Sequence, residues 1–64
     1  MKDDLIALRL ECAFMQDRAE KTARDDSRPM HVQECNWAIQ DVLGVVLDRI
    51  DKILKKEELN NEHN

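Results

Sequence analysis

A single short break divides this sequence into two long segments of periodic apolar residues, and this division limits the folds that the chain can adopt. The break is RDDSRP at residues 24–29, which includes the one proline of the chain. Aspartate and serine supply turn and helix-capping side chains, and proline is favoured in the first turn of a new helix. One glycine and one proline leave room for very few turns, and the spacing and length of the apolar segments favour helices over strands.

The segment before the break predicts a helix over residues 3–24. Asp3 or Asp4 can cap it, and its apolar residues recur at alternating steps of three and four, as in helices packed side by side. This stripe consists of Met1, Leu5, Leu8, Cys12, Met15, Ala19 and Thr22. We therefore expect this stripe to pack against the second helix.

The segment after the break predicts a helix over residues 29–58 and a frayed polar tail at 59–64. Its stripe consists of Val32, Cys35, Ile39, Val42, Val46, Ile50 and Ile53, and Leu43, Leu47 and Leu54 widen it on one flank. A turn as short as 25–28 makes the two helices antiparallel neighbours. The predicted fold class is all-α, with residues 1–64 forming one helical-hairpin domain.

The first helix is apolar on a second side as well. With successive residues about 100° apart, Ile6, Leu10 and Phe14 lie opposite the packing stripe. Leaving each of these side chains in water forgoes roughly 1.5–3 kcal/mol of burial, and a chain of 64 residues has only a marginal core of its own. We therefore predict that these residues form an oligomer interface in a homo-oligomeric helical bundle. A different protein, or a patch left exposed, are the alternatives.

Trp37 is predicted to point away from the stripe of the second helix, among polar and acidic residues. Tryptophan in such a setting is frequently a hot spot of a protein interface. Asp41 lies beside it, and Gly44, two turns on, is expected to leave an open surface. We predict Trp37, Asp41 and Gly44 as partner-binding candidates, the alternative being a ring that covers its neighbours or is covered by the next subunit.

No pattern indicates catalysis, a cofactor or a metal, so we expect a protein that is not an enzyme. His31 and Cys35 have the i, i+4 spacing of two ligands on one helix, but a metal site needs more. Cys12 and Cys35 fall on the packing stripes and are predicted to be small buried hydrophobic residues, too far apart for a disulfide within one chain. A redox-sensing cysteine or an interchain bridge is the alternative.

The formal net charge of −4 disfavours a protein that coats nucleic-acid phosphates. In DRAEKTARDDSR, four acids neutralise the basic residues, which predicts a solvated face with ion pairs. Asp3 and Asp4 stand where a signal peptide would carry positive charge, and no apolar run is long enough for a membrane span. We therefore expect a cytoplasmic protein that neither binds nucleic acid nor inserts into a membrane.

The stretch MKDDLIALRLECAFMQDRAEKTARDDSRP resembles the small early-region proteins of lambdoid bacteriophages, such as those encoded between exo and xis. The resemblance lies in size and acidic helical style, and no residue carries a role across. It implies an accessory protein that binds a host protein in the host cytoplasm and alters host physiology or phage development. In length and hairpin layout the chain is also similar to the RNA-binding plasmid regulator Rop, and a small chaperone of a secretion apparatus is the third alternative.

Overall fold

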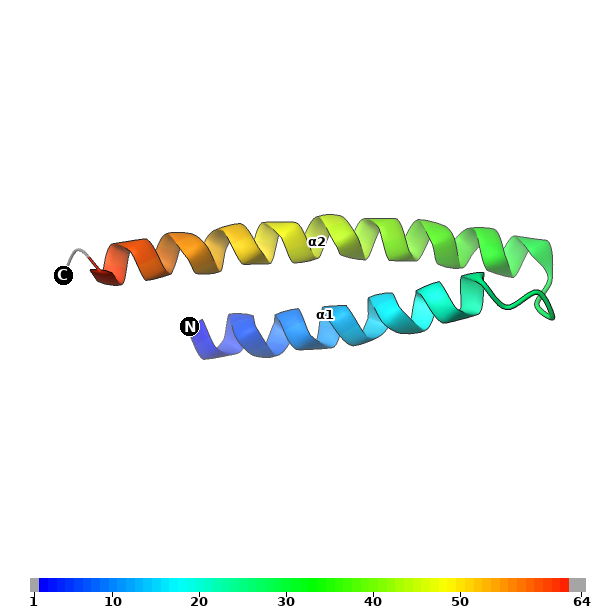
Figure 1. The fold of residues 1–64 in the computed structure, drawn as a ribbon, viewed down its shortest axis with the longest axis horizontal. Helices are drawn as coiled ribbons and strands as arrows, with labels where there is room; N and C mark the ends of the chain where they lie inside the picture. Colours follow the sequence, from blue (N-terminus) through cyan, green and yellow to red (C-terminus); the bar gives the residue numbers. More distant parts are fainter. Residues whose placement is uncertain (1, 63–64) are drawn as a thin grey trace.

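The computed structural model describes residues 2–62 as two antiparallel helices that pack against each other (Figure 1). Helix α1 spans Lys2–Ala23 and helix α2 spans Met30–Glu62, with a loop at residues 24–29 between them. The hairpin is an elongated rod whose Cα atoms extend over 53 × 15 × 12 Å. The predicted all-α hairpin is therefore confirmed.

Helix α2 continues to Glu62, four residues beyond the predicted end at residue 58. The tail that was predicted to fray from residue 59 is therefore helical through residue 62. The sequence KKEEL at residues 55–59 consists of strong helix formers, which is why the helix extends beyond its last contacts with α1. Met1 of the predicted stripe and residues 63–64 of the predicted tail lie outside the described residues.

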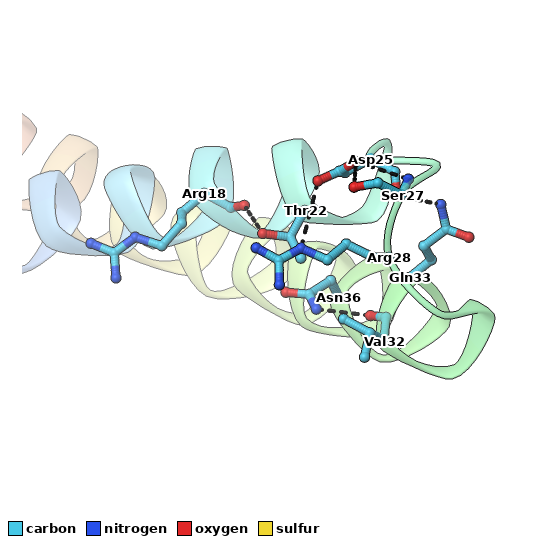
Figure 2. A network of polar contacts seen from close by, with 8 residues as sticks. All are labelled: Arg18, Thr22, Asp25, Ser27, Arg28, Val32, Gln33 and Asn36. Carbon is cyan, nitrogen blue, oxygen red and sulfur yellow. Dashed lines mark hydrogen bonds and ion pairs between the residues drawn. The ribbon is translucent and has the colours of Figure 1, made fainter.

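The loop is held by its own polar groups (Figure 2). The Asp25 carboxylate accepts hydrogen bonds from the Ser27 backbone N–H at 3.0 Å and from the Ser27 hydroxyl at 2.6 Å. The Gln33 side chain donates to the Asp25 carbonyl oxygen at 2.8 Å, which ties α2 back to the loop. The Pro29 carbonyl accepts from the N–H groups of Val32 and Gln33 and so begins α2, as the position of the proline predicted.

The core of the hairpin is a thin seam of small side chains. The buried hydrophobic residues of the described chain are Cys12, Ala19 and Ala23 on α1 and Ile50 on α2, and none of the large side chains there is fully buried. The small residues of α1 let α2 approach closely, so that Leu43, Leu47 and Leu54 become half-buried beside Ile50. This seam is a narrow contact for two helices of 22 and 33 residues.

The seam is rotated relative to the predicted stripes. On α2 it uses the leucine flank and Ile50, whereas Cys35, Ile39, Val42 and Ile53 of the predicted stripe are exposed. On α1, Cys12 and Ala19 are in the seam, but Leu8 and Met15 are exposed. The prediction that the whole of each stripe packs inside the hairpin is wrong, because two helices in contact along one seam cover only part of stripes this wide.

Candidate protein-interaction surfaces

One edge of the hairpin is closed by polar contacts between α1 and α2. Arg9 donates to both carboxylate oxygens of Asp51, from Nε at 2.5 Å and from Nη2 at 3.4 Å. The Gln16 side chain donates to the Gln40 carbonyl oxygen at 3.4 Å. We call this side of the hairpin the polar edge. The side chains of Arg9, Gln16 and Asp51 find their hydrogen-bonding partners there within the chain.

The ion pair of Arg9 and Asp51 shifts both pKa values in the direction of the charged forms. The hydrogen bond from Arg9 and its positive charge lower the pKa of Asp51, and the same contact raises the pKa of Arg9. At the loop, the hydrogen bonds from Ser27 lower the pKa of Asp25. Arg9 and Asp51 are exposed and Asp25 is half-buried, so these shifts mark contacts near the surface that are screened by solvent.

The opposite edge of the hairpin is apolar and uncovered. An open groove of about 530 Å³ runs between the helices toward the loop end. Its walls are Met15, Arg18, Ala19, Thr22, Asn36, Ala38, Ile39, Val42 and Leu43. Leu8 lies two turns before Met15, and Ile53 lies on the same side of α2 as Ile39 and Val42, so the apolar surface continues beyond the groove. We define Leu8, Met15, Ile39, Val42 and Ile53 as the groove face.

A second apolar surface lies along the side of α1 that faces away from α2. Ile6, Leu10 and Phe14 follow one another at i, i+4 steps, and each is exposed, Phe14 to 64%. We call these three residues the α1 ridge. The structure thus leaves in solvent the residues that the sequence predicted as an oligomer interface.

Trp37 lies beside the end of α1 and is 39% exposed. The guanidinium of Arg24 stands over its ring, 5.7 Å from the centroid, in a cation–π arrangement. Asp41, one turn further along α2, is exposed. The ring therefore contacts a neighbour in the loop and still presents a large apolar surface next to a carboxylate.

Gly44 does not lie on an open surface. A Cβ atom at this position would stand 3.2 Å from Nε2 of Gln16 on α1. Gly44 therefore belongs to the polar edge, where it gives the Gln16 side chain room to reach α2. The expectation of an open partner surface at Gly44 is wrong, and of the three predicted partner-binding residues Trp37 and Asp41 share the exposed patch.

The basic residues near the loop are largely neutralised by acids on the same helix or in the loop. Lys21 pairs with Asp17 at 3.0 Å and Arg24 with Glu20 at 2.9 Å. Arg28 contacts Asp25 at 3.5 Å (Figure 2). These pairs form the solvated face that the sequence predicted, and they leave little free positive charge for phosphates.

The two cysteines have different environments. Cys12 is buried in the seam as predicted, whereas Cys35 is exposed, contrary to the prediction. Among the described residues there is no cluster of three or more His, Cys, Asp or Glu side chains that could hold a metal ion. No helix of the described chain is both long and apolar enough to cross a membrane.

Comparison with known protein families, curated proteins and solved structures finds no match for this chain. The surfaces therefore have to be interpreted from their own chemistry. Sequence reasoning placed the α1 ridge and Trp37 at the surface but missed the groove face, because it assigned Met15, Ile39 and Val42 to the core. The signal was present in the width of the apolar stripe on α2, which exceeds what a seam of small residues on α1 can cover.

Proposed function

We propose that this protein is a small non-enzymatic helical module that self-associates and binds a protein partner as an accessory or regulatory factor of the cytoplasm. The observation that supports this proposal is the distribution of apolar surface. Eleven large hydrophobic side chains are exposed among the residues that the structure describes, and none of the large ones there is fully buried. Exposed apolar surface of this kind on a soluble domain is typical of interaction sites.

Two separate apolar surfaces support both parts of the proposal. The groove face spans both helices, and the α1 ridge lies on the far side of one helix. A single contact between two flat faces covers only one of them, so self-association through either surface leaves the other available. With the Trp37 and Asp41 patch, the hairpin offers enough surface for a second copy and for a different protein.

The resemblance to small phage proteins, which comes from the sequence, extends the proposal to a host protein as the partner. A secretion-type chaperone is the second candidate, and the observation that favours it is the open groove of about 530 Å³ between the helices, whose lining is largely apolar. An RNA-binding hairpin is disfavoured because Lys21, Arg24 and Arg28 are paired with acids.

Affinity capture with the full chain tests the proposal. The protein is immobilised through a tag and exposed to a bacterial lysate with and without nuclease, beside the Trp37→Ala variant. We expect one dominant protein whose recovery is insensitive to nuclease and falls for Trp37→Ala, while circular dichroism shows unchanged helicity. Recovery of nucleic acid that weakens steeply with salt would instead favour the RNA-binding alternative, because phosphate contacts release counterions.

A further inference from the structure

We propose that the groove face is the self-association surface, and that a second copy of this chain packs on it by a two-fold axis that crosses the middle of the hairpin. This inference rests on the self-association part of the proposed function and assigns it to a surface other than the α1 ridge. The product is a four-helix bundle in which α1 packs on α1 of the partner and α2 on α2. Three features of the structure support it.

The first feature is the register of the two helices, which determines which residues of α1 and α2 are level with each other. Arg9 of α1 lies beside Asp51 of α2. Because the helices are antiparallel, six residues further along α1 corresponds to six residues back along α2, which makes Met15 level with Val45. We call the end of the hairpin opposite the loop the open end. A two-fold axis that passes at this level, perpendicular to the helices, places the open end of one copy on the loop end of the other.

The second feature is the unequal bulk of the two ends of the groove face. At the loop end the small side chains of Ala19, Thr22 and Ala38 leave a hollow between the larger residues that also line the groove. At the open end stand Leu8 and Ile53, both large and exposed. Leu8 is seven residues before Met15 and Thr22 is seven after it, so the axis sets Leu8 of each copy against the groove end of the other. Large side chains thus meet a hollow, as close packing requires.

The third feature is charge. Glu11 lies between Leu8 and Met15 on the same side of α1, and Arg18 follows Met15 by one turn. Neither has an ion-pair partner among the described residues. The proposed axis brings Glu11 of one copy to the level of Arg18 of the other, twice per dimer.

The size of the face is sufficient for a second copy. Helix α1 has 22 residues, and at 1.5 Å per residue it is about 33 Å long. The Cα atoms of the hairpin extend 15 Å across. A flat face of these dimensions covers roughly 500 Å² on each copy, or about 1,000 Å² over both, which is at the lower bound for a specific protein–protein interface.

Glutamate substitutions at two almost equally exposed positions test whether the groove face is the self-association surface. Val42 of the groove face is 62% exposed and Phe14 of the α1 ridge is 64% exposed. Sedimentation equilibrium or light scattering on the full chain at tens of micromolar measures assembly, and circular dichroism checks the fold. We expect a dimer for the wild type and for Phe14→Glu, and a helical monomer for Val42→Glu, with the dissociation constant raised at least tenfold.

Charge reversal tests the two-fold arrangement itself. E11R and R18E each place like charges opposite one another across the axis, so each variant alone is expected to dissociate at least tenfold more readily. An equimolar mixture of the two restores opposite charges at both contacts and is expected to form a heterodimer of wild-type affinity. If the mixture does not recover, the proposed axis is wrong.

The outcomes separate this inference from the proposed function. A wild-type dimer that Phe14→Glu dissociates and Val42→Glu leaves intact would overturn the groove assignment and preserve self-association through the α1 ridge. A wild type that is monomeric at tens of micromolar would overturn both, and would leave the groove to a client segment of another protein.

Discussion

The two edges of this hairpin are built by the same two helices, yet one is closed and the other is open. On the polar edge, Arg9 reaches Asp51 and Gln16 reaches the Gln40 carbonyl, so the contacts are completed within the chain. On the apolar edge, Met15, Ile39 and Val42 line a groove with nothing across it.

The two edges differ because polar groups and apolar surface are stabilised in different ways. Directional polar groups need one well-placed partner each, and two antiparallel helices in a fixed register can supply it. Apolar area is buried only by extended contact with more protein, and two helices that touch along one thin seam bury only part of it. This hairpin therefore satisfies the polar groups of one edge within the chain and keeps the apolar side chains of the groove face exposed.

The largest loss of stability is expected for a substitution in the seam, and a position of the groove face one turn further along α2 provides the comparison. Ile50 is buried and Ile53 is exposed. Ile50→Asp buries an unpaired carboxylate in the seam and is expected to destabilise the hairpin by about 3–5 kcal/mol, which abolishes the helical signal in circular dichroism. Ile53→Asp is the control and is expected to keep its helicity while weakening assembly. Equal helicity in the two variants would contradict the thin seam described here.

A smaller effect is expected where Trp37 contacts the end of α1. Trp37→Ala removes the cation–π contact with Arg24 and part of a half-covered ring, and we expect a loss of about 1 kcal/mol in the free energy of unfolding by urea. Trp37→Phe keeps a ring over Arg24 and is expected to lose less than half as much. A loss of several kcal/mol in Trp37→Ala would mean that the ring belongs to the core and is not a surface for a partner.

Substitution of Gly44 tests the polar edge, and here we expect a gain in stability instead of a loss. Alanine is favoured over glycine inside a helix by about 0.5–1 kcal/mol. The new Cβ atom would stand 3.2 Å from the flexible end of Gln16, which has to shift by a few tenths of an ångström. We therefore expect Gly44→Ala to raise the melting temperature slightly. A lower melting temperature for Gly44→Ala would show that Gln16 is held rigidly on the polar edge.

The smallest effect is the pH dependence of the polar edge. The pKa of Asp51 is lowered in the folded chain by Arg9, so the folded state favours the ionised carboxylate. The stabilisation is complete above the pKa of the unfolded chain, about 3.9 for aspartate, and is lost as the pH falls through the lower folded value. Urea midpoints at pH 7 and pH 3 are expected to differ less for Asp51→Asn than for the wild type. Asp25, whose pKa is lowered by Ser27, is unaltered in this variant and provides the internal reference.

The sequence predicted the elements of this fold closely because their signals are local. Helix α1 begins and ends within one residue of the predicted bounds, and Pro29 with the Asp25 and Ser27 turn marks the start of α2. The end of α2 was placed four residues early, because polar residues after 58 were interpreted as a tail although they include good helix formers. The exposed positions of the α1 ridge and Trp37 also followed from helical spacing alone.

The tertiary structure alone decided which part of each apolar stripe is inside. Helical spacing places Ile39 and Ile50 on the same stripe, and the sequence has no local signal that distinguishes the half-buried Leu43 from the exposed Val42 beside it. That choice depends on the rotation of each helix about its axis, which is set by the small side chains of Cys12, Ala19 and Ala23 across the seam and by the contact of Arg9 with Asp51. Composition and periodicity determined that this chain folds as a hairpin with excess apolar surface. The packing of one helix on the other, which is a property of residues far apart in the sequence, decided where that surface lies.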